Sequence, residues 1–219
     1  MIQNPDNRPH FNAAAETWDV NPRRVNLARH VMQSMEKRLP FQADWNALEI
    51  GCGTGLLSCP VSSMITSLTA LDTSEGMIDE LNKKIRSRRI SNIQPVVSDI
   101  FTFPHVPEQK KEYHLIFSNM TFHHIANVNG VLYKLYSLLL PGGYLAVADL
   151  DEEDGYFHND GNEKVHHGFR RSLFKTQLLQ HGFTDISFST AAALTKINRV
   201  NIEKTYTVFL VVARKSKEQ

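Results

Sequence analysis

Three glycines at alternate positions follow a short apolar segment near residue 50. The segment 46–50 predicts a buried strand, and Gly51, Gly53 and Gly55 come directly after it. Glycine lets the backbone turn tightly, and it lets a ligand reach the backbone amides without meeting a Cβ atom. These residues therefore predict a turn between a strand and a helix that holds a flat ligand, with a ligand-free glycine turn as the alternative.

The spacing within this turn distinguishes two kinds of nucleotide ligand. A dinucleotide-binding turn has a further glycine at the position that Leu56 occupies here. Glu49 lies two residues before the first glycine, and an acid there suits the ammonium of a methionyl group better than a pyrophosphate. We therefore expect an adenosyl cofactor without phosphate.

Two motifs resemble a known enzyme family. Glu49, one apolar residue and Gly-x-Gly-x-Gly resemble the first motif of the class I S-adenosylmethionine-dependent methyltransferases, and Leu-Leu-Leu-Pro-Gly-Gly-Tyr-Leu at 138–145 is a further match. His-His-Gly-Phe-Arg at 166–170 looks similar to small-molecule methyltransferases of the ubiquinone and menaquinone biosynthesis type. The resemblance covers about residues 11–214 and implies S-adenosylmethionine as the cofactor.

Acidic residues end the second and third predicted strands. Asp72 ends the strand 67–72, where a carboxylate can accept both hydroxyl protons of a ribose. The alternative role of Asp72 is to cap the helix that begins near Ser74. The resemblance implies that Asp99 accepts a hydrogen bond from the adenine amino group, while Ile100 supplies an apolar neighbour for the ring.

The resemblance adds residues from the fourth strand and from the N-terminus. Asn119 ends the strand 113–119, which lies beneath the sulfonium in the family, and the Met-Thr-Phe that follows departs from the Pro-Pro-aromatic pattern of enzymes that methylate nucleic-acid bases. An N-terminal lid would bring Phe11 and Trp18 to the cofactor, or both would be packing anchors. The candidate cofactor-binding residues are Phe11, Trp18, Glu49, Gly51, Gly53, Gly55, Asp72, Thr73, Met77, Asp99, Ile100 and Asn119.

Histidine is the natural base for a methyl transfer that must remove a proton from a hydroxyl nucleophile. Four of the ten histidines lie at a predicted strand end or in an overhanging loop, and we prefer His124 and His167 as catalytic candidates. Adjacent histidines do not place both rings on one face, and the spacing of Cys52 and Cys59 matches no zinc site. We therefore expect no metal ion.

These residues need an α/β framework to position them. Periodicity predicts further strands at 93–97, 144–149, 183–190 and 203–214, and helices at 23–39, 56–64, 75–89, about 132–139 and 170–180. A mobile leader at 1–10 precedes a short helix from Phe11, and a loop at 151–168 should overhang the site. Residues 191–200 connect the last two strands, which should pair antiparallel because no crossover helix separates them.

We therefore predict a Rossmann-like, seven-stranded, mostly parallel sheet with an antiparallel last strand, helices on both faces and an N-terminal helical lid. The 219 residues would form a single domain, with the lid at 1–40 and the core at 41–219. The 24 Lys and Arg nearly balance the 23 Asp and Glu, and the mean hydropathy is −0.31. We expect a cytoplasmic monomer or homodimer with neither nucleic-acid nor membrane partners.

The leading hypothesis is methyl transfer from S-adenosylmethionine to an oxygen, nitrogen or carbon atom of a small molecule. A methyltransferase acting on a protein side chain would need an open groove beside the loop 151–168. A nicotinamide-dependent oxidoreductase is disfavoured by Leu56 and Glu49. The remaining alternative is a non-catalytic protein that binds S-adenosylmethionine. The lack of a clear catalytic base does not decide between this protein and an enzyme, because methyl transfer to an already nucleophilic atom needs no base.

Overall fold

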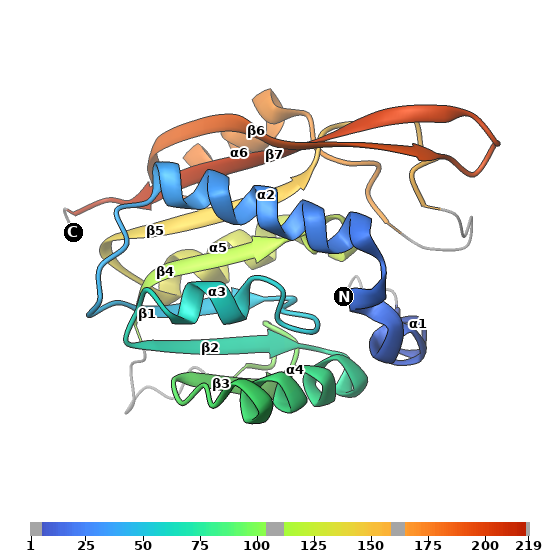
Figure 1. The fold of residues 1–219 in the computed structure, drawn as a ribbon. Coiled ribbons are helices and arrows are strands. Elements are labelled where there is room, and N and C mark those ends of the chain that lie inside the picture. Colours follow the sequence, from blue (N-terminus) through green and yellow to red (C-terminus); the bar gives the residue numbers. More distant parts are fainter. Residues whose placement is uncertain (1–5, 104–111, 159–164, 218–219) are drawn as a thin grey trace.

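A seven-stranded sheet forms the centre of the computed structural model, which describes residues 6–103, 112–158 and 165–217. The strand order is β3-β2-β1-β4-β5-β7-β6 (Figure 1). Strands β1 to β5 pair parallel, whereas β7 pairs antiparallel with both β5 and β6, as the sequence predicts. The strands are β1 Asn46–Ile50, β2 Ser67–Asp72, β3 Ile93–Val97, β4 Tyr113–Asn119, β5 Leu139–Leu150, β6 Phe183–Ile197 and β7 Glu203–Lys215.

Helices cover both faces of the sheet, because the strands are apolar on both sides. In β1, Ala47 belongs to the apolar cluster beneath α2, α3 and α4, whereas Leu48 and Ile50 belong to the cluster beneath α5 and α6. The helices are α1 Arg8–Ala14, α2 Pro22–Arg38, α3 Ser58–Ser62, α4 Glu75–Arg88, α5 Val128–Leu138 and α6 Arg171–Gln180, with 3₁₀ turns η1 Ala15–Val20 and η2 Phe122–His124.

Local capping explains where two of these helices begin. The side chain of Asn21 accepts a hydrogen bond from the backbone of Arg23, and Pro22 occupies the first turn of α2, where its missing N–H costs nothing. Ser74 caps α4 by accepting from the backbone N–H of Met77 at 3.2 Å. The cap of α4 is therefore Ser74, which leaves Asp72 for another role.

Five expected boundaries are wrong. Helix α5 begins at Val128 and not at about 132, because the side chain of Asn127 caps it by accepting from the N–H of Gly130. Helix α3 is shorter than 56–64 because the backbone still turns at Gly55, whose N–H donates to Cys52. Strand β5 begins at Leu139 because that residue pairs with Tyr113 before a register shift. Strand β6 continues to Ile197 instead of ending at 190, and the expected leader is already helical from Arg8.

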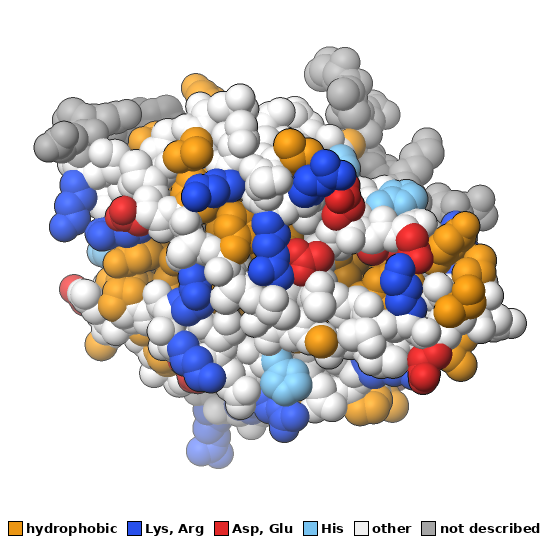
Figure 2. Space-filling view, turned by 90° about the horizontal axis from the view of Figure 1, so that it is seen from above, with side chains coloured by type: hydrophobic (Ala, Val, Ile, Leu, Met, Phe, Trp, Pro, Cys, Tyr) orange, Lys and Arg blue, Asp and Glu red, His pale blue; other side chains and the backbone are white. Residues whose placement is uncertain are grey.

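The strand β6 extends because it pairs with β7 almost to the hairpin turn, and this hairpin projects beyond the rest of the sheet (Figure 1). On the face seen in Figure 2, acidic and basic side chains are interspersed with hydrophobic ones. No helix in the part of the chain that the structure describes is long and apolar enough to cross a membrane.

Candidate functional site

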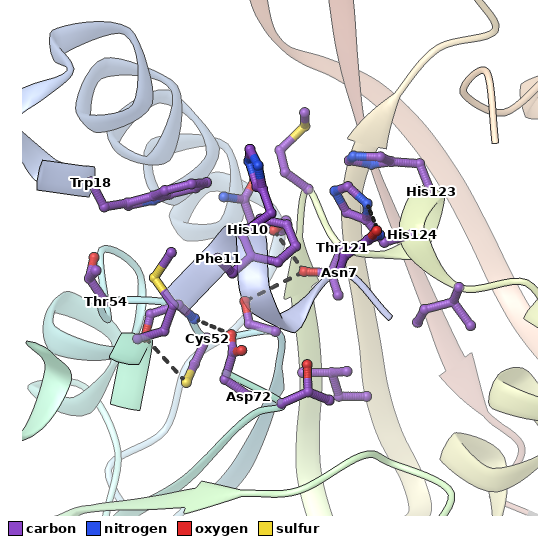
Figure 3. A pocket seen from close by; sticks show the side chains of 18 of the residues that line it. Asn7, His10, Phe11, Trp18, Cys52, Thr54, Asp72, Thr121, His123 and His124 are labelled. Atoms are coloured by element: carbon purple, nitrogen blue, oxygen red, sulfur yellow. Dashed lines mark hydrogen bonds between the residues drawn. The ribbon is translucent and has the colours of Figure 1, made fainter. Parts of the chain in front are cut away.

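A large cavity opens where the parallel strands end, beneath α1 and η1. Its volume is about 1510 Å³, and Figure 3 shows residues of the glycine turn, of the strand ends and of the N-terminal segment facing one another across it. The carboxyl ends of parallel strands are where open α/β sheets bind ligands. Of the residues expected at the site, those that line the cavity are Phe11, Trp18, Glu49, Gly51, Gly53, Asp72, Thr73, Met77, Asp99, Ile100, Asn119 and His124.

The three glycines of the turn have different reasons to be glycine. Gly51 has a φ of +67°, and a Cβ atom there would lie 2.1 Å from the hydroxyl oxygen of Thr121. Gly53 also has a positive φ, but its nearest neighbour would be Met77 at 3.9 Å, so the space above it is open. Gly55 does not line the cavity, and its Cβ would meet Leu81 at 2.4 Å. The third glycine therefore serves packing against α4.

Asp72 fixes the glycine turn to the end of β2. Its Oδ2 accepts from the backbone N–H of Gly53 at 2.8 Å, and its Oδ1 accepts from the N–H of Ser74 at 2.9 Å. Burial raises the pKa of this carboxyl, while the backbone hydrogen bonds oppose the rise. A carboxylate has about four acceptor sites, so both oxygens can still accept from a ligand.

Glu49 is a buried acid at the end of β1, and it lines the same cavity. The hydroxyl of Ser58 donates to its Oε2. Burial raises the pKa of Glu49 to about 8, an effect that the Ser58 hydrogen bond opposes and that the nearby charge of Asp72 strengthens. A cationic ligand group would favour the ionised carboxylate.

The end of β3 forms one wall of the cavity. Asp99 accepts from the backbone N–H of Phe101 at 2.7 Å through Oδ1, and the adjacent Ile100 is buried. Val97 and Ser98 also line this wall. The wall thus offers a second oxygen and an apolar surface to a ligand.

The N-terminal segment is bound to the glycine turn and to α4 by polar contacts. The Oδ1 atom of Asn12 accepts from the Ser74 hydroxyl at 2.6 Å and from the N–H of Gly76 at 3.1 Å. Asp19 accepts from the Thr54 hydroxyl at 2.6 Å and forms an ion pair with Lys84. This segment therefore roofs the cavity.

Aromatic rings line the underside of this roof. Phe11 packs edge-on against Trp18 and against His124, with ring centroids 5.8 Å and 5.3 Å apart. The guanidinium of Arg24 lies 3.6 Å from the centre of the Trp18 ring, and burial lowers the pKa of Arg24. The roof is thus an apolar surface with a cation at its edge.

The end of β4 carries Asn119, whose amide oxygen Oδ1 is buried and accepts no hydrogen bond from any residue that the structure describes. A buried carbonyl without a partner costs about 1 to 3 kcal/mol. Because Asn119 lines the cavity, a donor on a bound ligand would remove this cost.

Beyond Asn119, the short turn η2 places two histidines at the opposite end of the cavity from Asp72. The rings of His123 and His124 lie 4.1 Å apart, and His158 lies 5.1 Å and 5.5 Å from them. Burial, followed by the neighbouring histidines, lowers the pKa of His124 to about 2, and burial lowers that of His158 to about 3. Both rings are therefore neutral near pH 7.

Known proteins share these features. A family model described as a methyltransferase domain matches residues 47–143, which run from β1 to the start of β5 and include the glycine turn. The chain is 32% identical over 160 residues to malonyl-[acyl-carrier protein] O-methyltransferase 2 of Ilyobacter polytropus, an alignment that covers 72% of this chain and 58% of that protein. Residues 47–143 thus belong to a methyltransferase domain of the class I S-adenosylmethionine-dependent type.

Two further comparisons agree with this family. The chain is 25% identical over 169 residues to the mitochondrial ubiquinone biosynthesis O-methyltransferase of Arabidopsis thaliana, covering 68% of this chain and 50% of that protein. It therefore spans little more than half the length of these two relatives. In fold, the solved DhpI complex with S-adenosylhomocysteine is similar, with a TM-score of 0.71 and 18% identity over 96% of this chain and 95% of that one.

The structure does not bring His167 to the cavity. Its side chain is 61% exposed, and its Nδ1 lies 4.0 Å from the carboxylate of Glu153. The backbone N–H of Glu153 donates to the carbonyl of His167, so the two ends of the expected overhanging loop 151–168 are joined here. Phe157 and His158 of the same loop do line the cavity, and residues 159–164 lie outside the described residues.

Three residues at this site were not selected from the sequence: His123 was one of the four histidines considered but was not preferred, and His158 and Asp149 were not considered. His123 and His158 line the cavity, and Asp149, at the end of β5, bonds to His123. Asp149 could have been found in the sequence, because it is an acid at the end of the fifth predicted strand, just as Asp72 and Asp99 follow the second and third. Among the described residues, no group of three or more His, Cys, Asp or Glu side chains is arranged to hold a metal ion.

Proposed function

We propose that this protein transfers a methyl group from S-adenosylmethionine to a small-molecule acceptor. The observation that carries the proposal is one continuous cavity whose two ends have different chemistry. The glycine turn, Glu49 and Asp72 lie at one end, and the histidines of η2 lie at the other. A methyl donor and an acceptor need such adjoining places, because methyl transfer is an in-line displacement that depends on alignment.

The residues at the first end fit an adenosyl and methionyl ligand. Asp72 would accept from the ribose hydroxyls, while Asp99 and Ile100 would hold the adenine edge and face. Glu49 would accept the ammonium, and the buried Oδ1 of Asn119 would gain a donor. Gly51, Gly53, Thr73 and Met77 complete the pocket floor, and Phe11 and Trp18 would cover the ligand. The sulfonium of the bound cofactor supplies the methyl group.

The acceptor would occupy the space between the roof and the histidines. The two relatives described above are named as O-methyltransferases, one of malonyl-[acyl-carrier protein] and one of ubiquinone biosynthesis, which supports an oxygen acceptor here. We assign His124 to this space as an acceptor contact and no longer favour it as the base, since a ring with a pKa of about 2 takes up a proton poorly near pH 7.

The remaining organisation is part of the same proposal. Residues 1–40 would act as the lid and 41–219 as the core of a single domain, because Asp19 bonds to Thr54 of the glycine turn and Asn12 bonds to Ser74 and Gly76 at the start of α4. We further propose a cytoplasmic monomer or homodimer.

A screen for methyl transfer tests the proposed function. The protein is incubated with S-adenosylmethionine that carries a tritiated methyl group and with fractionated metabolite extracts. We expect label in a small organic product together with release of S-adenosylhomocysteine. Label found only in protein fractions, or none in any fraction despite tight cofactor binding, would contradict small-molecule methyl transfer.

A further inference from the structure

His123 and Asp149 form a buried pair at the acceptor end of the cavity. The Nδ1 atom of His123 lies 2.6 Å from Oδ1 of Asp149, and both side chains are almost completely buried. His123 comes from η2, whereas Asp149 comes from β5. The fold therefore joins two residues that lie far apart in the sequence.

Backbone donors hold the carboxylate of Asp149 in place. Its Oδ1 also accepts from the N–H of Leu150 at 2.7 Å, and its Oδ2 accepts from the N–H of His123 at 3.3 Å. An ionised carboxylate that already accepts from two backbone N–H groups has no hydrogen to donate, so the hydrogen between the two side chains belongs to Nδ1 of the imidazole. In the neutral ring, the lone pair is then on Nε2, the nitrogen on the far side of the ring from Asp149.

The two histidine rings nearest to His123 do not compete with it for a proton near pH 7. His124 and His158 are the nearest rings, and burial lowers their pKa values to about 2 and about 3. His10 lies on α1, Lys196 on β6, and His166 donates its backbone N–H to the carbonyl of His123. His123 is in direct contact with the carboxylate of Asp149, which would stabilise its imidazolium form.

We propose that His123 is the proton acceptor of the reaction, that Asp149 is its positioning residue, and that the acceptor is therefore an aromatic hydroxyl compound. This inference rests on the proposed methyl transfer. A carboxylate or a neutral amine would need no base for its attack, so the pair would be idle with such acceptors. A phenol, with a pKa of about 10, is much better matched to a histidine base than an alkyl alcohol is. Phe11, Ile125, Phe157 and Leu194 give the ring apolar neighbours.

The step balances as follows. The phenolic oxygen gives its proton to Nε2 of His123 and forms a bond to the methyl carbon. The bond from that carbon to sulfur breaks, and its electron pair stays on sulfur, so the products are a methyl ether and S-adenosylhomocysteine. The imidazolium, held by Asp149, then passes its proton to solvent.

The first test does not depend on catalysis. Nitrogen-15 NMR of the full chain with S-adenosylhomocysteine bound, assigned with His123→Gln, reports the protonation of each ring nitrogen. We expect a neutral ring with hydrogen on Nδ1, and we expect Asp149→Asn to move it to Nε2. A wild-type ring with hydrogen on Nε2 would overturn the proposal.

The second test uses a panel of simple acceptors: phenols and catechols, carboxylic acids and their thioesters, and primary amines. We expect methyl ethers of phenols, with kcat falling as the pH is lowered because a protonated ring cannot accept a proton. His123→Gln should lower kcat by roughly 10² to 10⁴ and remove this pH step, with cofactor affinity unchanged. Asp149→Asn should lower kcat with little effect on KM.

The matched control is His30→Gln, because His30 is exposed on α2 and is distant in the sequence from η2. We expect the His30→Gln variant to behave as wild type. Methylation of carboxylates or amines only, or a His123→Gln variant that keeps kcat within twofold, would overturn the base assignment while leaving methyl transfer intact. Failure to bind S-adenosylhomocysteine would instead refute the proposed function.

Discussion

At the residue scale, Asp72 accepts from Gly53 and Ser74 and also faces the cavity. We predict that Asp72→Ala weakens binding of S-adenosylhomocysteine by about 1.5 to 3 kcal/mol, the range for losing hydrogen bonds to a charged acceptor. Isothermal titration measures this loss. Asp79→Ala, an exposed acid on α4, is the control and should bind normally.

The two roles of Asp72 give different outcomes. If its only role were to hold the turn, Asp72→Ala would lower the thermal stability while the folded fraction bound the cofactor with unchanged affinity. That result would contradict the ribose contact. We expect a lowered affinity together with a smaller loss of stability.

Glu49 makes stability depend on pH in a definite direction. Its pKa is raised from 4.5 to about 8 by burial, so the folded protein keeps a proton that the unfolded chain releases. Stability from this group is full below about pH 4.5 and is lost as the pH rises through about 8. We predict that Glu49→Gln raises Tm by about 2 to 8 °C at pH 8 and changes it little at pH 4.

The same acid predicts proton release on cofactor binding. A ligand ammonium near Glu49 lowers the raised pKa, so at pH 7 a mostly neutral carboxyl becomes ionised. Titrations of wild type in buffers of different ionisation enthalpy should give release of up to about one proton, and Glu49→Gln should release none. Equal proton release from both proteins would remove Glu49 from the ammonium site.

At the scale of elements, the turn between β1 and α3 depends on two glycines that differ in one respect. Both have positive φ, but only Gly51 faces Thr121 closely enough to clash with an added Cβ. We predict that Gly51→Ala lowers the free energy of unfolding by more than about 2 kcal/mol and that Gly53→Ala costs about 1 kcal/mol. Urea denaturation compares them, and equal losses would show that the Thr121 contact is easily relieved.

The α1–η1 roof depends on Asn12, which bonds to Ser74 and Gly76 on α4. We predict that Asn12→Ala speeds cofactor dissociation about tenfold and raises hydrogen exchange in residues 6–20, because the roof loses two hydrogen bonds. Asn26→Ala, exposed on α2, is the control. S-adenosylhomocysteine should slow exchange in residues 6–20 and 151–158 of wild type, and unchanged exchange in both segments would contradict a closing lid.

At the scale of the whole molecule, the local sequence pattern was enough to predict the strands that line the cofactor end of the cavity. Strands β1 to β4 have the predicted bounds because each is a short apolar run that ends at a glycine or a polar residue. Strand β6 was predicted too short because residues 191–193 are alanines, which are depleted in strands. Their strand conformation comes from long-range pairing with β7, and this is not visible in a local window.

The same distinction applies to the site. Asp72 and Glu49 could be predicted because they stand at a fixed distance from the glycines. His123 and His124 are adjacent and look alike in the sequence. Only the fold brings Asp149 into contact with His123. It buries His124 next to other histidines, and this lowers the pKa of His124. The base therefore could not be chosen from spacing alone.

The measurement that tests the central claim most directly is a calorimetric titration of the full chain with S-adenosylmethionine, S-adenosylhomocysteine and NAD. We predict one site for each of the first two ligands and no binding of NAD, because Leu56 replaces the glycine that a pyrophosphate needs. Binding of NAD with equal or higher affinity would contradict the account.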